Sequence, residues 1–272
     1  MVDWEIGTTC QRCDGPAQRV DGVYYFLDLR GVRPVRAPKK EPTDQASWSK
    51  RRQRDYAYLR EKIAAIEPGS LVLDLGAGPG YFRAMYADHR YVGVDFQPYA
   101  GVDVVADLTE SLPFASSAAD AVVLTHTLEH IPEPERLLAE SNRVLRPGGM
   151  LLVVVPFVIR LHQVPHDFLR YTRFMLDYLL EKTGYRDVEI EEVGDIFDLH
   201  EIVLRDLMIT LRKNADQRLG RAEAREVRKH VLGPFRKSVQ REVEALRSRL
   251  GDDVAVLGEG SYPCGYGLVA YK

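Results

Sequence analysis

The sequence lacks the features that mark membrane and secreted proteins. It has no apolar run near the roughly 18 residues of a membrane-spanning helix, and its longest one, MLLVVVPFVI, has the length of a strand. The first residues, MVDWEIGTTC, show no basic segment followed by an apolar one, so no secretory signal is expected. Three cysteines in 272 residues are typical of reduced thiols. We therefore expect a cytoplasmic protein without a disulfide framework.

Strong net charge is also absent. The formal net charge is −3, and 28% charged with 45% hydrophobic residues is typical of an ordinary globular protein. Charge is nevertheless uneven, because residues 212–249 hold 12 Lys and Arg against 5 Asp and Glu. Such an excess is typical of phosphate binding, but Phe235 is the only aromatic residue there for base stacking. A solvated helical face, a homo-oligomer contact or a substrate lid remain alternatives to nucleic-acid binding.

A complete set of zinc ligands is missing as well. Cys10 and Cys13 have the spacing of half a zinc knuckle, whereas tetrahedral zinc takes four ligands. Cys264 is distant in sequence, and the first 80 residues contain no histidine. The segment therefore predicts a small metal-free β-hairpin, and the missing ligand pair argues against zinc.

The order of the remaining segments predicts the domain organisation. Residues 1–46 read as an N-terminal extension and a proline-rich linker, and residues 47–272 as one large domain. Strand-like segments alternate there with helices or crossovers, in SLVLDLGAG, YVGVDF, GVDVVADL, ADAVVLTH and GMLLVVVPF. This alternation predicts an α/β fold with a mostly parallel sheet covered on both faces. A helical insertion at about 200–252 separates a sixth strand, RDVEIEEVG, from the last, GYGLVAYK.

A glycine turn follows the first strand of this domain. The segment VLDLGAGPG places Gly76, Gly78 and Gly80 where the backbone can turn tightly and approach a ligand. Their spacing does not match the dinucleotide pattern Gly-x-Gly-x-x-Gly, since position 81 is Tyr. Asp74 at the strand end would repel a diphosphate but accept a hydrogen bond from an ammonium group. The ligand is therefore expected to have a cationic end.

Aspartates also end the next two strands. Asp95 ends VGVD, where a carboxylate is placed to bind both hydroxyls of a ribose. Asp107 ends VVAD and is placed to accept a hydrogen bond from an adenine amino group. Open α/β sheets bind their ligands at this edge. Three aspartates beside a glycine turn thus predict a nucleoside ligand that carries a cation.

Together these motifs resemble the class I S-adenosylmethionine-dependent methyltransferases. The likeness runs from Leu71 to Phe157, and THTLEHI and RVLRPGGMLLVVVP are similar to the branch with LEH after strand four and RVLRPGG before strand five. The resemblance implies a Rossmann-like seven-stranded sheet with helices on both faces and an antiparallel last strand. It implies S-adenosylmethionine as cofactor and S-adenosylhomocysteine as product. It assigns the following residues to the cofactor: Asp74, Gly76, Ala77, Gly78, Gly80, Asp95, Phe96, Asp107, Leu108 and Thr125.

The acceptor side is expected in LHQVPHDFLRYTRF, which follows the fifth strand. Methyl transfer needs positioning and desolvation, and a hydroxyl acceptor also benefits from a general base. The candidate catalytic residues are His126, which leaves the fourth strand, and His166 and Asp167. Arg170 and Tyr171 are candidates for binding polar groups of the acceptor. The alternative is that Asp167 and Arg170 pair only to fix the loop.

The histidines of this segment do not predict a metal site. His162 and His166 are four residues apart, but Pro165 between them disfavours a helix and no Glu follows His162. Glu129 and His130 of the LEH turn are expected to make structural contacts within that turn. No metal is therefore predicted.

The sequence thus predicts a methyltransferase acting on a small-molecule or glycan-type acceptor. The pattern HDFLRYT resembles methyltransferases of sugar, cell-surface glycan and secondary-metabolite pathways. One alternative is an RNA methyltransferase of the ribosomal type, favoured by the ribbon-like N-terminus and the basic insertion. Another is a non-catalytic S-adenosylmethionine-binding module, against which the polar cluster at 162–171 argues.

Overall fold

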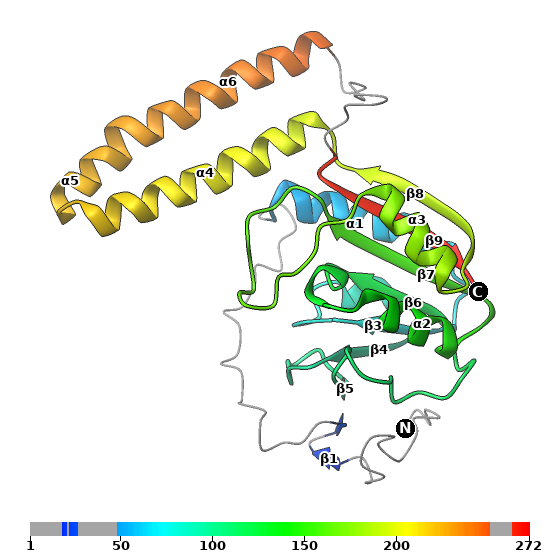
Figure 1. Cartoon of the computed structure of the whole chain (residues 1–272). Coiled ribbons are helices and arrows are strands. Elements are labelled where there is room, and N and C mark those ends of the chain that lie inside the picture. Colours follow the sequence, from blue (N-terminus) through cyan, green and yellow to red (C-terminus); the bar gives the residue numbers. More distant parts are fainter. Residues whose placement is uncertain (1–17, 21, 27–47, 251–262) are drawn as a thin grey trace.

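The computed structural model describes residues 18–20, 22–26, 48–250 and 263–272 (Figure 1). Cys10 and Cys13 lie outside these residues. The predicted division into residues 1–46 and 47–272 stays a prediction.

A nine-stranded sheet with the order β1-β2-β5-β4-β3-β6-β7-β9-β8 forms the centre of the molecule. Pairing is parallel from β5 through β7, and β9 runs antiparallel between β7 and β8. The prediction of a Rossmann-like, mostly parallel sheet with an antiparallel last strand is confirmed. The strands are β1 (Gln18–Val20), β2 (Val23–Tyr25), β3 (Leu71–Leu75), β4 (Arg90–Asp95), β5 (Val104–Val105), β6 (Ala119–Thr125), β7 (Leu145–Pro156), β8 (Arg186–Val193) and β9 (Gly265–Tyr271).

The sheet has two more strands than the seven predicted. β1 and β2 pair with each other antiparallel, and β2 extends the sheet by pairing parallel with β5. The backbone amides of Tyr24 and Phe26 donate to the carbonyls of Asp103 and Val105 at this edge. Such pairing uses backbone groups alone, so no side-chain pattern announces it.

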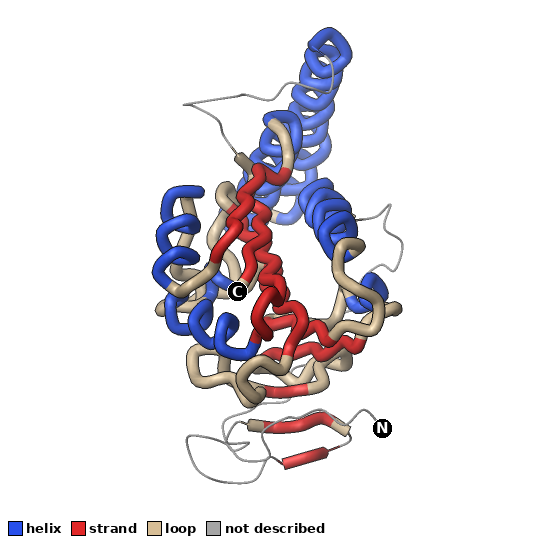
Figure 2. The backbone as a smooth tube through the Cα atoms, turned by 90° about the vertical axis from the view of Figure 1, so that its right-hand side faces the viewer, coloured by secondary structure: helices blue, strands red, loops and turns tan. Residues whose placement is uncertain are grey.

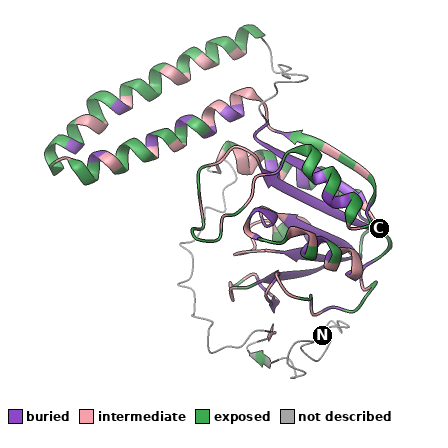
Figure 3. Ribbon diagram, in the orientation of Figure 1, coloured by how far each residue is buried: buried purple, intermediate pink, exposed green. Residues whose placement is uncertain are grey.

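Helices cover both faces of the twisted sheet (Figure 2). Every residue of β3 is buried, as expected for a strand packed on both sides. On one face, Leu59 and Ile63 of α1 pack near Val72, Val123 and Leu152 of the sheet. The other face carries α2 and α3, and the purple strands of Figure 3 mark the core between the layers. The covering helices are α1 (Lys50–Ile63), α2 (Pro134–Val144) and α3 (Arg173–Lys182), with short 3-10 turns η2 (Arg83–Tyr86) and η3 (Leu128–His130).

A long helical hairpin extends away from the sheet between β8 and β9 (Figure 1). It consists of α4 (Ile196–Arg218), α5 (Arg221–Glu226), the π-helical η4 (Val227–Leu232) and α6 (Gly233–Leu250). Asp195 and Asp198 form a capping box at the start of α4, so the helix begins before the expected residue 200. Leu204, Met208 and Leu232 form a small core between its helices. No helix in the described ranges is long and apolar enough to cross a membrane.

Candidate cofactor and acceptor site

The glycine turn after β3 has a backbone that favours glycine. Gly76, Gly78 and Gly80 have φ angles of 88°, 53° and 77°, in the left-handed region that side chains disfavour. A Cβ atom on Gly76 would also lie only 2.2 Å from Oγ1 of Thr127, a hydroxyl that donates to the carbonyl of Leu75. The turn therefore packs directly against the residues that follow β6.

Asp95 ties this turn to the end of β4. Its carboxylate accepts hydrogen bonds of 2.9 Å from the backbone amides of Gly78 and Gln97. Burial raises the pKa of Asp95, while the backbone donors act in the opposite direction. A buried carboxylate at the cavity wall is chemically suited to accept hydrogen bonds from paired hydroxyls.

The other two predicted aspartates differ from each other in environment. Asp74 is buried beneath the turn, where the Tyr91 hydroxyl donates to it at 2.8 Å, and burial raises its pKa to about 7. Asp107 reaches the cavity, and its Oδ1 accepts hydrogen bonds from the amide and the hydroxyl of Thr109.

One cavity of about 530 Å³ lies at this edge of the sheet. Of the residues assigned to the cofactor, six line it: Gly76, Gly78, Asp95, Phe96, Asp107 and Leu108. Asp74, Ala77, Gly80 and Thr125 are not among the described residues that line it. The lining also includes residues that the sequence did not single out, namely Pro79, Tyr99, Thr109, Thr127, Ile131 and Gln163. Pro79, Thr127, Ile131 and Gln163 lie within the quoted motifs, and only their position there could have indicated them.

The segment after β7 closes the acceptor side of the same cavity. His166 and Gln163 line it together with His126 and His130, which follow β6. Backbone amides of Phe168 and Leu169 donate to the carbonyl of Glu129, and thereby dock the segment on η3. The segment is not helical, as Pro165 predicts. Two motifs some 35 residues apart thus form one wall.

Three of the predicted acceptor residues lie within the wall itself. Arg170 binds Asp167 with two hydrogen bonds, of 2.7 and 3.0 Å, and lowers the pKa of that carboxyl. Asp167 also accepts the backbone amide of His162 at 2.9 Å. Tyr171 is 2% exposed, and its hydroxyl donates to the carbonyl of Leu128 at 2.9 Å. These contacts suit the alternative in which the residues fix the loop, and they leave the exposed His166 as the candidate that faces the cavity.

His126 is held between two carboxylates. Its φ angle is 53°, its Nε2 lies 2.8 Å from Asp55 of α1, and its Nδ1 lies 3.7 Å from Glu129. Burial lowers the pKa of His126, but Asp55 and Glu129 together outweigh burial and raise this pKa to about 9. The two carboxylates therefore favour the imidazolium form, which cannot accept a proton from an acceptor. The sequence carried no signal for Asp55, because it lies on a helix far from the cofactor motifs.

Comparisons with known proteins agree with this geometry. Residues 73–153 match the family model described as a methyltransferase domain. An uncharacterized methyltransferase of Mycobacterium avium is 41% identical over 98 residues, which cover 31% of this chain and 39% of that protein. A demethylmenaquinone methyltransferase of Renibacterium salmoninarum is 33% identical over 128 residues, covering 43% and 54%. The chain thus spans about two fifths to one half of the length of these curated relatives.

Solved structures share the fold at low sequence identity. A SAM-dependent methyltransferase from Archaeoglobus fulgidus superposes with a TM-score of 0.50 and 20% identity, covering 81% of this chain and 94% of that one. The structure described as the [4+2]-cyclase SpnF has a TM-score of 0.50 and 19% identity, covering 86% and 84%. The match shows that residues 73–153 form a methyltransferase domain, and the strand order is that of the S-adenosylmethionine-dependent methyltransferase fold, whose cofactor is S-adenosylmethionine.

Proposed function

We propose that this protein transfers the methyl group of S-adenosylmethionine to a small-molecule or glycan-type acceptor. One observation carries the proposal: the glycine turn and two aspartates share a single cavity with His166 and Gln163 of the segment after β7. Donor and acceptor can therefore be enclosed together, as a direct transfer between them requires.

The cofactor side has residues that fit S-adenosylmethionine, which supplies an electrophilic methyl group when bound. Asp95 would bind the ribose hydroxyls, and Asp107 the adenine amino group. Gly76 and Gly78 line the cavity and would let the backbone approach the ligand, because glycine has no side chain. Asp74 would balance the ammonium charge from beneath the turn, where its carboxyl is buried.

The acceptor side has one exposed imidazole and one amide. His166 would take the proton that an acceptor hydroxyl releases, and Gln163 would hydrogen-bond a polar group of the acceptor. Asp167 and Arg170 would act as positioning residues that hold this segment. The volume of the cavity lies within the range usual for small ligands. The name of the Renibacterium relative, a demethylmenaquinone methyltransferase, also favours a small-molecule acceptor.

Cofactor binding tests the first part of this proposal. Calorimetric titration of the full chain with S-adenosylmethionine should give one site, which Asp95→Ala should weaken by at least about tenfold. Asp177→Ala, at an exposed position on α3, is the matched control and should bind as the wild type does. Undiminished binding by Asp95→Ala, or no binding by the wild type, would sink the assignment.

Turnover tests the second part. Transfer of labelled methyl should be assayed against fractionated small molecules, glycans and RNA. His166→Ala should lower kcat while the cofactor affinity stays constant, and unchanged kcat would remove His166 from the reaction. Cofactor binding without transfer to any fraction would favour a non-catalytic binding module.

An RNA acceptor is the second candidate, favoured by the positive charge of the helical hairpin. Residues 212–249 carry 12 Lys and Arg against 5 Asp and Glu. This candidate requires RNA binding whose affinity falls steeply with salt concentration, since phosphate contacts release counterions. RNA affinity without such dependence, or none at all, would reject it.

A further inference from the structure

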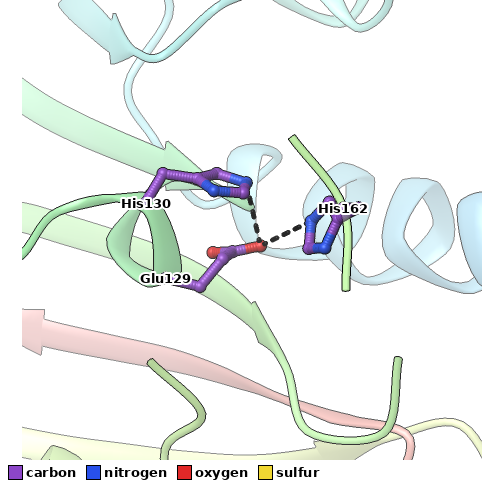
Figure 4. Close-up of side chains that lie close together, drawn as sticks. All are labelled: Glu129, His130 and His162. Atoms are coloured by element: carbon purple, nitrogen blue, oxygen red, sulfur yellow. Dashed lines mark ion pairs between the residues drawn. The ribbon is translucent and has the colours of Figure 1, made fainter. Parts of the chain in front are cut away.

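Glu129 is a buried carboxylate without a hydrogen-bond donor. Its side chain is fully buried within η3, and neither carboxylate oxygen accepts a hydrogen bond from the described part of the chain. A charge removed from water without partners is costly, so its surroundings should show what compensates it. Figure 4 shows what lies there: the rings of His130 and His162 both point toward one oxygen of Glu129. Each Nε2 is 3.8 Å from Oε1, too far for a hydrogen bond.

The other ring nitrogen of His130 determines what its Nε2 can offer. Nδ1 lies at hydrogen-bond distance from the backbone carbonyl of His166, and a carbonyl oxygen only accepts. Nδ1 therefore carries the hydrogen, and the Nε2 of the neutral ring presents a lone pair. That Nε2 is buried and has no hydrogen-bond partner among the described residues. A lone pair facing a carboxylate is repulsive unless a cation lies between them.

His162 also faces Glu129, from the segment after β7. Its Nδ1 lies near Oδ2 of Asp167, at 3.3 Å without a formed hydrogen bond, while its Nε2 faces Glu129. Asp167 is in turn held by Arg170 through two hydrogen bonds. Histidines that bind metals usually place their second nitrogen against a carboxylate or a backbone carbonyl, which fixes the ring. His130 has the carbonyl and His162 has the carboxylate.

We propose that Glu129, His130 and His162 bind one divalent transition-metal ion. One ligand atom from each lies within 4.8 Å of the others, and the unpartnered Glu129 points into the group. Donor atoms around a tetrahedral ion lie roughly 3.3 Å apart, so the side chains would close by about one ångström on binding. Two imidazoles and one carboxylate suit zinc or iron(II), whereas magnesium and calcium prefer oxygen ligands alone.

The position of this site has a consequence for the reaction, which rests on the proposed function. His130 lines the cavity, so a metal bound to it would lie at the acceptor wall. Three protein ligands leave a coordination position open, and a hydroxyl bound there would lose its proton more readily. The alternative is that no metal binds and that the negative charge of Glu129 is balanced by protonated histidines. His126, whose Nδ1 lies 3.7 Å from Glu129, would be one of them.

Metal titration of the full chain, without cofactor or acceptor, separates this proposal from the proposed function. A background with Cys10→Ser and Cys13→Ser removes the N-terminal thiols as competing ligands. This parent should bind one equivalent of Zn²⁺ by calorimetry, and Co²⁺ should give visible absorption bands without thiolate charge transfer. His162→Ala and Glu129→Gln should each weaken binding by more than about 100-fold, a loss larger than that usual for residues outside the ligand set.

Two control variants sharpen the test. His166→Ala removes the histidine that sequence spacing would pair with His162, and His230→Ala removes an exposed histidine on the hairpin. Both should bind Zn²⁺ as the parent does. If Glu129→Gln does not fold, as judged by circular dichroism, the result for His162→Ala is used instead. The side chain of His162 is 22% exposed in a loop, so its removal should be tolerated by the fold. A parent protein that binds no metal, or a His162→Ala variant that binds it equally well, overturns the proposal. The charge of Glu129 is then balanced by protonated histidines.

Discussion

The carboxyl group of Asp74 differs strongly in pKa from an ordinary carboxylic acid. Burial raises its pKa from 3.8 to about 7, so the folded protein holds a proton that the unfolded chain releases. Between about pH 4 and pH 7 the unfolded state therefore binds fewer protons, and the free energy of unfolding falls as pH rises. The hydrogen bond from Tyr91 lowers the pKa of Asp74 and only partly offsets burial.

Asp74→Asn should remove this pH dependence. The amide of the variant keeps an acceptor for the Tyr91 hydroxyl and carries no charge. The variant should therefore be as stable as the wild type near pH 4 and more stable than the wild type at pH 8. The full shift in the pKa of Asp74 corresponds to a difference of at most about 4 kcal/mol in the free energy of unfolding. Urea denaturation at several pH values measures the difference, with the exposed Asp177→Asn as control. A difference between the two proteins that does not grow with pH would contradict the environment described for Asp74.

Gly76 allows a second test, because Gly148 is a glycine with a similar backbone that does not line the cavity. Gly76 and Gly148 have similar φ angles of 88° and 75°, so alanine strains both backbones. Only at Gly76 would the added Cβ collide, at 2.2 Å from Thr127, whereas Gly148 has nothing within 4 Å. Gly148→Ala should cost about 1 kcal/mol and bind S-adenosylmethionine normally. Gly76→Ala should cost more and lose at least about tenfold in cofactor affinity by calorimetry; equal affinities would contradict the close packing of the turn.

At the scale of elements, the LEH turn and the segment after β7 behave as one unit. The hydroxyl of Tyr171 donates to the carbonyl of Leu128 in η3, and the amides of the two residues before Arg170 donate to the backbone carbonyl of Glu129. The sequence indicated that both segments lie at the ligand edge, since each follows a strand of the parallel sheet. It did not indicate that they contact each other, because no pattern in either one encodes the partner. That contact is also what brings His162 to Glu129.

Tyr171→Phe tests whether this docking serves the reaction. Tyr185→Phe is a close control, because its buried hydroxyl donates to the carbonyl of Leu138 in α2, away from the cavity. Each variant loses one buried hydrogen bond and should be destabilised by about 1 kcal/mol in urea denaturation. Only Tyr171→Phe should also lower kcat in the labelled-methyl assay, since it loosens the acceptor wall. Equal kcat values would mean that the bond contributes to stability alone.

For the whole molecule, sequence patterns predicted the order and type of the main elements well. Buried strands such as LVLDL are apolar apart from Asp74, and the hairpin helices are long, so both leave strong signals. The N-terminal residues predicted a small β-hairpin, but the pairing of β2 with β5 at the sheet edge uses backbone groups and leaves almost no signal. At the site, the glycines and aspartates at strand ends could each be predicted from their place in a motif. The contacts of His126 with Asp55 and of His162 with Glu129 could not be predicted, because they depend on tertiary packing.

The helical hairpin can be separated from the site by deletion. The described residues that line the cavity all lie outside α4 to α6, while Arg247 contacts Asp195 and Phe197 at the base of the hairpin. Replacing residues 208–236 by a short Gly-Ser turn should therefore keep the base and leave S-adenosylmethionine affinity unchanged by calorimetry. The deletion removes 8 Lys and Arg and 3 Asp and Glu, so any RNA affinity carried by the hairpin should fall and lose part of its salt dependence.

A double variant, Arg225→Glu with Lys229→Glu, changes charge at two exposed positions and keeps the helices. If both proteins transfer methyl to the small-molecule fraction at the wild-type rate, the hairpin is dispensable for that reaction. If either keeps cofactor affinity but loses transfer, the hairpin takes part in acceptor recognition, and loss in the double variant would make its positive charge responsible.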